Sequence, residues 1–205
     1  MIAEMYRNIG ISNLYYIVSI NNLTSIFNNG ILSKNLIISK NIKYDDISNE
    51  EVQNIRNKRH VFDYELHDYV NLFINPRNSM MYSVQHNKGN SILSVLEINI
   101  DILNDSFSAV SDGNCASDNT KYYRSIDGYH NIDCKSIFKN YWVRPDGSVD
   151  NEQKRIISAE ALVLNNVPFK YINRIIVNNN NTKEIIDSMN LGVEVVTSRW
   201  PFFYI

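Results

Sequence analysis

The chain has 205 residues, of which 44% are hydrophobic and 20% charged, and its formal net charge is −2. This composition is typical of a folded soluble protein. The weak negative charge argues against a protein that coats nucleic acid by bulk positive charge, but it leaves room for a nucleic acid held in a local groove.

The sequence contains no sign of export, membrane insertion or metal binding. The N-terminus MIAEMYRNIG lacks the features of a signal peptide, and no apolar run is long enough to span a bilayer. The two cysteines, Cys115 and Cys134, do not suggest a disulfide framework, and their spacing matches no zinc signature. No linker divides the chain. We therefore expect a cytoplasmic protein, without metal, whose residues 1–205 form a single domain.

The first half of the chain alternates between apolar runs and polar segments with helix signals. In chain order, the sequence predicts a strand over 14–20, a short helix that begins at Asn21 or Asn22 and ends at Gly30, a polar and helix-biased segment over 40–62 with a capping box at Ser48 and Glu51, a strand over 68–74, a turn and helix over 75–85, and strands over 91–100 and 107–112.

The second half opens with a polar stretch, residues 113–155, that is rich in Asn, Asp, Ser, Tyr and Lys. A long irregular segment inside a compact domain is often a functional loop. The following residues predict strands over 155–164 and 172–178, a helix over 182–190, and strand-like segments over 193–198 and 201–205. This balance predicts an α+β fold.

Glu160 is the first candidate for chemistry. It lies in the run RIISAEALVL, where strand alternation places it on the same face as Ile156, Ser158 and Leu162. An ionised carboxylate on a partly apolar face is costly unless it is paired or used. The alternative is a glutamate on an edge strand that faces water.

The segment NPRNSMMY is the second candidate. Ser79 and Tyr82 are three residues apart, so they share one face of a helix. A hydroxyl and an aromatic ring on one face suit a planar amide ligand. The alternative is an ordinary helix N-terminus, with Asn78 or Ser79 as the cap and Tyr82 packing against neighbours.

Two further segments carry polar groups. His67 precedes a strand beside Asp68, and the alternative to a functional role is a histidine satisfied by local hydrogen bonds. In residues 111–125, Asn114, Tyr122 and Tyr123 offer amide and stacking groups that suit unpaired bases, unless the tyrosines pack on the core. Phosphate-binding signatures such as the P-loop and GxGxxG are absent.

Taken in order, these segments resemble the DarT family of DNA ADP-ribosyltransferases. The matching pieces are YYIVSINNL, NGIL, the polar segment that ends in Arg56 and Arg59, LHDYVNLFINPRNSMMY, VSDGNCAS, AEALV and RWPFFY. The resemblance implies an ADP-ribosyltransferase fold: a split mixed or antiparallel β-sheet core with flanking helices and a long substrate-recognition loop. It also implies NAD⁺ as co-substrate, a base in single-stranded DNA as acceptor, and a toxin whose partner is a DarG-type macrodomain antitoxin.

The resemblance further implies roles for individual residues. Glu160 is expected to take a proton from the attacking base nitrogen, and either Arg56 or Arg59 is expected to stabilise charge in the site. The residues expected to contact NAD⁺ are Ser19, Asn22, Gly30, His67, Tyr69, Phe73, Ser79, Met80 and Tyr82. Those expected to contact DNA are Asn114, Tyr122, Tyr123 and Arg155.

The sequence departs from the family pattern at two informative positions. Ser19 stands where relatives carry histidine, and relatives differ at the position of Asn114, which leaves open whether thymidine or guanosine is modified. Two other functions remain as alternatives: an ADP-ribosyltransferase of RNA or protein, and a non-catalytic nucleic-acid-binding module.

Overall fold

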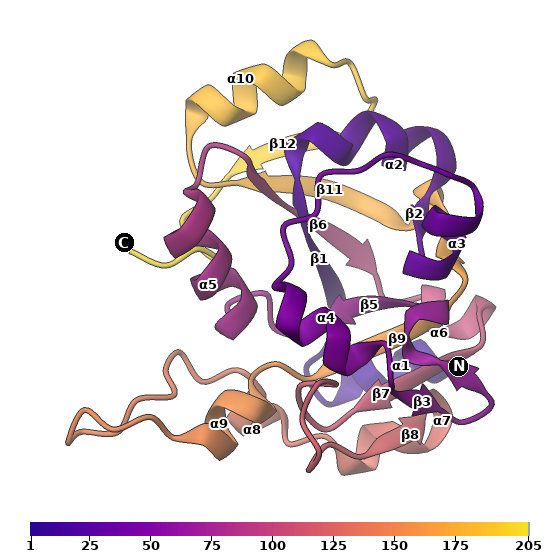
Figure 1. The fold of residues 1–205 in the computed structure, drawn as a ribbon, viewed down its shortest axis with the longest axis vertical. Coiled ribbons are helices and arrows are strands. Elements are labelled where there is room, and N and C mark those ends of the chain that lie inside the picture. The colour runs from indigo at the N-terminus through magenta and orange to yellow at the C-terminus, as the bar shows by residue number, and fades with distance from the viewer. Residues whose placement is uncertain (205) are drawn as a thin grey trace.

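The structure, a computed structural model, describes residues 1–204 (Figure 1). The helices are α1 (Ile2–Asn8), α2 (Leu23–Asn29), α3 (Lys34–Ser39), α4 (Glu50–Arg56), α5 (Ser79–Lys88), α6 (Ile102–Asp105), α7 (Ser125–Gly128), α8 (Cys134–Ile137), α9 (Asn151–Ile156) and α10 (Asn180–Ser188), with short 3-10 turns η1 (Ile20–Asn22), η2 (Leu66–Asp68), η3 (Tyr129–Asn131) and η4 (Phe169–Tyr171). The strands are β1 (Asn13–Ser19), β2 (Ile31–Leu32), β3 (His60–Val61), β4 (Tyr64–Glu65), β5 (Tyr69–Phe73), β6 (Leu93–Asn99), β7 (Ser108–Ser111), β8 (Tyr122–Arg124), β9 (Glu160–Leu164), β10 (Asn166–Val167), β11 (Ile172–Val177) and β12 (Glu194–Thr197).

Eight of these strands form one sheet in the order β12-β11-β6-β1-β5-β9-β7-β8. The pair β11–β12 is parallel, and the other neighbouring pairs are antiparallel. Helices flank this mixed sheet (Figure 1). The predicted α+β class is confirmed.

The sheet is split near its middle. β1 pairs with β6 along its whole length, from Asn13 to Ser19. Against β5 it makes a single pairing, Tyr15 with Phe73. Because β1 and β5 stay together at only one point, they diverge beyond it and leave space between the two halves of the sheet.

Both faces of the sheet are buried. Along β1, Leu14 and Val18 belong to the largest apolar cluster, whereas Tyr15 and Ile17 belong to a second cluster on the opposite face. This double burial explains why the strand reads as a continuous apolar run in the sequence rather than as an alternation.

Most predicted elements are confirmed, with ends shifted by a few residues. Gly30 ends α2 with a positive φ of 79°, as predicted. The elements confirmed in this way are the strands β1, β5, β6, β7, β11 and β12 and the helices α2, α5 and α10.

Two local predictions are wrong because side chains cap a helix in a different way. The predicted strand over 155–164 forms only from Glu160 onward. Its first residues belong to helix α9, which Asp150 caps by accepting the N–H of Gln153 at 3.0 Å. The predicted capping box at Ser48 and Glu51 does not form. Asn49 is the cap of α4 instead, and accepts the N–H of Val52 at 3.1 Å.

The C-terminal segment and the polar stretch 113–155 also differ in part from the predicted structure. Residues 201–204 form a turn and no strand, and the N–H of Phe203 donates to the side chain of Gln85 at 2.8 Å. The last residue of that predicted strand, Ile205, lies outside the described residues. Residues 113–155 are mostly irregular, as predicted, but include β8 and three short helices, and part of the stretch projects from the body in Figure 1 (orange, lower left).

Within residues 1–204, no helix combines the length and the apolar character needed to cross a bilayer.

Candidate active site

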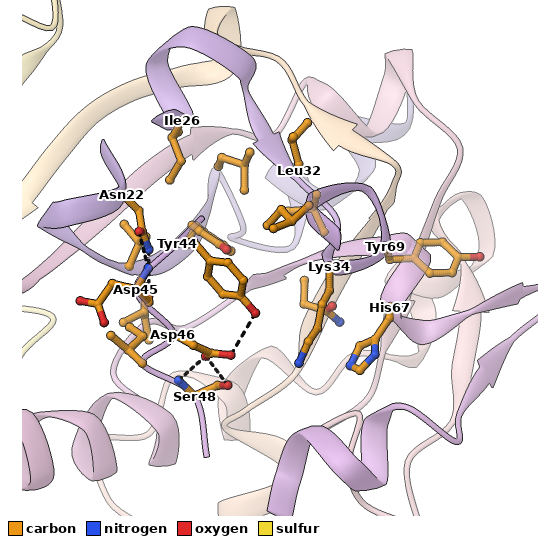
Figure 2. Close-up of a pocket in the computed structure, with 18 of the residues that line it drawn as sticks. Asn22, Ile26, Leu32, Lys34, Tyr44, Asp45, Asp46, Ser48, His67 and Tyr69 are labelled. Atoms are coloured by element: carbon orange, nitrogen blue, oxygen red, sulfur yellow. Dashed lines mark hydrogen bonds between the residues drawn. The ribbon is translucent and has the colours of Figure 1, made fainter. Parts of the chain in front are cut away.

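A cavity opens where β1 and β5 diverge. It encloses about 1170 Å³, its open mouth included. Its walls come from β1, α2, α3, the segment before α4, and β5, and Figure 2 shows most of the lining residues. The side chains that carry charge or can carry it in this lining are Lys34, Asp45, Asp46, Arg56, His67 and Glu160.

Glu160 and Arg56 form a buried ion pair in this cavity. Nη2 of Arg56 donates to Oε2 of Glu160 at 2.5 Å, and Nη1 donates to Oε1 at 3.2 Å. Burial disfavours the charged guanidinium, but the charge of Glu160 and its hydrogen bonds outweigh this, so the pKa of Arg56 is raised. The pair joins α4 to the first residue of β9.

The backbone places Glu160 at the split of the sheet. Its partner in β5 is Phe73, the residue that also makes the single pairing with β1. Oγ of Ser111 accepts the N–H of Glu160 at 3.0 Å. The carboxylate therefore sits on a central strand, buried and held, and the alternative of a glutamate on an edge strand facing water is wrong.

The loop after β7 supplies a third donor to the carboxylate. The backbone N–H of Cys115 donates to Oε1 of Glu160 at 3.0 Å. Burial and then the nearby charge of Glu160 raise the pKa of the Cys115 thiol well above its ordinary value, so this cysteine stays protonated.

A covering segment, residues 40–59, closes one side of the cavity. Its anchor is Asp45, whose carboxylate accepts from Oγ of Ser19 at 2.6 Å and from the side chain of Asn21 at 3.2 Å. The side chain of Asn22 bonds the backbone of Asp45 in both directions, at 2.8 and 2.9 Å (Figure 2). The end of β1 therefore fixes the covering segment over the pocket.

Lys34, Gln53 and His67 form a polar row in another part of the lining, where α3 and η2 meet the covering segment. Nζ of Lys34 donates to Oε1 of Gln53 at 3.0 Å, and the same oxygen lies 3.1 Å from Nε2 of His67. Burial first, and then the charges of Lys34 and Arg56, lower the pKa of His67, which keeps its imidazole neutral.

The chemistry of the lining suits a dinucleotide such as NAD⁺. Apolar side chains can cover flat rings, and amides, carboxylates and a lysine can bond hydroxyls and phosphates. Asn71 also lines the cavity, and its buried Nδ2 finds no hydrogen-bond partner among residues 1–204. An unpaired buried donor costs about 1–3 kcal/mol, so a ligand oxygen at this point would relieve it.

Eight of the residues predicted for the site line this cavity. They are Asn22, Gly30, Arg56, His67, Tyr69, Phe73, Met80 and Glu160. Gly30 contributes only backbone atoms to the lining. A side chain would not fit at this position, because an added Cβ would come within 2.7 Å of the carbonyl oxygen of Val167. Arg59 lies outside and donates to the carbonyl of Ala116 and to Asp118.

Ser79 and Tyr82 lie on α5, outside the cavity lining. Oγ of Ser79 is 3.2 Å from Oγ of Ser158, two residues before Glu160. Tyr82 is 45% exposed and meets the rings of Trp142 and Phe203 edge-on, with centroids 6.0 and 5.4 Å away. The shared helix face exists, but Tyr82 belongs to a surface aromatic cluster.

The residues predicted to contact DNA sit around the turn that holds Glu160. Asn114 directly precedes Cys115, and its N–H donates to the carbonyl of Arg155 at 2.9 Å. The hydroxyl of Tyr122 donates to the carbonyl of Cys115 at 2.9 Å, and Tyr123 packs against the main core. Arg155 is occupied by Asp112 and Glu152.

Sequence reasoning missed Lys34, Asp45, Gln53 and Asn71. The helix signal in residues 40–62 predicts α4, but no local pattern indicates that Asp45, in the coil before that helix, contacts Ser19. Lys34 follows Ser33, a cap residue, and reads as an ordinary first residue of a helix.

Among residues 1–204, no group of three or more His, Cys, Asp or Glu side chains is arranged to hold a metal ion.

Comparison with known proteins identifies this fold. The chain resembles a Thermus sp. 2.9 DarT in complex with ADP-ribosylated ssDNA, with a TM-score of 0.83 and 20% identity over 94% of this chain and 97% of that chain. It also resembles a Thermus sp. 2.9 DarT in complex with NAD⁺ (TM-score 0.78, 19% identity, 95% and 98% covered). For a Thermosipho africanus DarTG in complex with ADP-ribose, the TM-score is 0.75 and the identity 29%, over 91% of this chain and 50% of that chain. The fold is thus that of DarT ADP-ribosyltransferases, as predicted.

The sequence comparison gives the family. Residues 15–204 match the family described as ssDNA thymidine ADP-ribosyltransferase, DarT. A DNA ADP-ribosyl transferase–DNA ADP-ribosyl glycohydrolase fusion protein of Thermosipho africanus (strain H17ap60334) is 34% identical over 191 residues, 88% of this chain. The chain belongs to the DarT family. It spans about half the length of the fusion protein, 47%.

Proposed function

We propose that this protein transfers ADP-ribose from NAD⁺ to a thymidine base in single-stranded DNA. The observation that carries the proposal is the buried pair of Arg56 and Glu160 at the split of the sheet, in a cavity whose lining suits a dinucleotide. Membership of a family described as ssDNA thymidine ADP-ribosyltransferase selects thymidine over guanosine as the acceptor.

NAD⁺ supplies the ribose carbon that the base attacks, and nicotinamide leaves with the electron pair of the broken bond. The base nitrogen forms the new bond to that carbon and gives up its proton to Glu160. Arg56 orients the carboxylate through two parallel hydrogen bonds and offsets negative charge that develops on the base. In this scheme Arg56, and not Arg59, is the arginine of the site.

The cavity residues hold NAD⁺. Met80 and Phe73 cover its flat groups, and Asn22, His67 and the backbone at Gly30 contact its polar groups. Tyr69 borders the cavity, but its ring points away from it and its hydroxyl donates to the carbonyl of Val61 (Figure 2). Ser19 acts indirectly: it bonds Asp45 and so fixes the covering segment over NAD⁺. Ser79 bonds Ser158, two residues before Glu160, and so supports the start of β9, and Tyr82 lies outside the cavity lining.

The turn around Cys115 presents the base to Glu160. Asn114 is next to the N–H that binds the carboxylate. Its side-chain oxygen accepts the N–H of Ala116 at 2.9 Å, so its amide N–H groups are the ones that contact the base edge. Tyr122 and Arg155 hold the turn in place, and Tyr123 packs beneath it.

The biological role follows from the relatives. One relative carries a DNA ADP-ribosyl transferase and a DNA ADP-ribosyl glycohydrolase in one chain. We accordingly assign a toxin role and a DarG-type macrodomain as the antitoxin that removes the modification. Both cysteines are free, which fits a reducing cytoplasm, and the joining of eight strands in one sheet fits a single catalytic domain.

The test is a labelling experiment. The purified protein is incubated with NAD⁺ and short DNA strands that contain or lack thymidine, in single-stranded and duplex form, and intact mass spectrometry detects added ADP-ribose. We expect labelling of thymidine-containing single strands, with removal of the label by a DarG-type hydrolase. Labelling confined to RNA or protein would overturn the acceptor assignment, and no nicotinamide release would overturn the whole proposal.

A further inference from the structure

The charges in the cavity identify one side chain that is free to bind an anion. Any ligand with a diphosphate brings two negative charges into this partly buried space, where an unpaired anion is costly. The cationic candidates in the lining are Lys34, Arg56 and His67.

Two of these candidates are already committed. Both terminal nitrogens of Arg56 bond Glu160. His67 has a lowered pKa, which leaves its ring neutral. Lys34 makes no ion pair with a carboxylate of residues 1–204, and its one hydrogen bond goes to the neutral amide of Gln53.

The position of Lys34 also suits this task. It starts α3 directly after Ser33, which is buried and caps the helix. Gln53 fixes its ammonium from the side and leaves two of its three N–H donors unused. Figure 2 shows Lys34 beside His67. Asp46 also lines the cavity without forming an ion pair with Lys34: burial raises the pKa of its carboxyl, but hydrogen bonds from Ser48 and Tyr44 and the charge of Lys34 lower it overall.

We propose that Nζ of Lys34 binds the diphosphate of NAD⁺ and so fixes the ADP-ribose half of the molecule in the cavity. The inference rests on the proposed function and adds to it a residue that positions the co-substrate.

The experiment compares Lys34→Gln with Lys40→Gln by calorimetric titration with ADP-ribose and with adenosine. Lys40 is an exposed lysine just after α3 and is not part of the lining, so it is a matched control. Loss of a charge-assisted contact predicts that Lys34→Gln binds ADP-ribose about tenfold to a hundredfold more weakly. Adenosine, which has no phosphate, should bind both variants equally, and Lys34→Arg should retain most of the affinity for ADP-ribose.

Three outcomes would overturn the inference. Lys34→Gln could bind ADP-ribose as tightly as the unmodified protein does. This result would disprove the role of Lys34 and leave the proposed function intact. A parallel loss of adenosine binding would show that Lys34 acts on the shape of the pocket. Failure of the unmodified protein to bind ADP-ribose would remove the inference together with the proposed function.

Discussion

The covering segment, residues 40–59, and the loop segment, residues 113–155, look alike in sequence, because both are polar and contain tyrosine. In the structure they meet on Glu160 from opposite sides, the first through the side chain of Arg56 and the second through the backbone N–H of Cys115. Their attachments to the body differ. Asp45 ties the covering segment to the end of β1, whereas Arg155 joins the two ends of the loop segment through the hydroxyl of Thr120 and the backbone N–H of Asn114.

This difference separates the two substrates. The covering segment is fixed to the wall of the cavity and is suited to hold NAD⁺. The loop segment has hydrogen bonds of its own, and part of it projects away from the body of the protein (Figure 1), which suits it to hold DNA. Variants at the shared residue, Glu160, and variants in each of the two segments can test this separation.

The largest effect is expected at the shared residue. Glu160→Gln keeps the size of the side chain but removes the proton acceptor, so labelling of DNA should fall about 10²–10⁴-fold. The amide can still accept from Arg56, and ADP-ribose binding should persist. Intact mass spectrometry of the DNA and titration with ADP-ribose measure the two effects.

Glu97→Gln is the matched control for this variant. Glu97 is also buried in the sheet and also pairs with an arginine, Arg174, at 2.9 Å, but it does not line the cavity. Its labelling activity should remain close to that of the unmodified protein. An active Glu160→Gln, or an equal loss in the two variants, would argue against a chemical role for Glu160.

The next effect separates two arginines of the covering segment. Arg56→Lys loses the two parallel hydrogen bonds to Glu160, because an ammonium cannot reproduce the planar fork. Labelling should fall about tenfold or more. Arg59→Lys changes a contact with the exposed Asp118 and should have little effect. Equal losses in the two variants would contradict the assignment of Arg56.

The sequence predicts the framework better than these attachments. Apolar runs and helix signals locate β1, β5, β6 and α5, because local side-chain patterns reflect burial. The resemblance to the family points to Glu160 and to a pair of arginines. The choice between Arg56 and Arg59 depends on the turn of α4 relative to β9, and the contact of Ser19 with Asp45 joins residues 26 positions apart. Neither contact leaves a local pattern in the chain.

On the loop side, Gly113→Ala is expected to have a moderate effect. An added Cβ would overlap the side chain of Arg155 and come within 2.9 Å of its Cγ. Arg155 would have to leave Asp112, which would loosen the turn that positions Cys115. We expect a loss of about 1–3 kcal/mol in the free energy of unfolding, weaker DNA labelling and unchanged ADP-ribose affinity.

A double variant checks the cause. If the overlap with Arg155 is responsible, Gly113→Ala should have little further effect on stability in an Arg155→Ala background. The same loss in both backgrounds would show that the glycine matters for another reason. A drop in ADP-ribose affinity would show that the two segments are not independent.

The smallest effect is a pH dependence on the covering side. The pKa of His67 in the folded protein lies below its ordinary value of 6.5, because burial and the charges of Lys34 and Arg56 outweigh those of Glu65 and Asp68. The unfolded chain therefore takes up a proton first as pH falls below about 6.5, and stability declines from there toward the folded pKa. Denaturant unfolding at a series of pH values should show this decline, and His67→Gln should reduce its slope. His86→Gln, which changes an exposed histidine outside the cavity, should leave the slope as it is; an unchanged slope in His67→Gln would show that another group causes the decline.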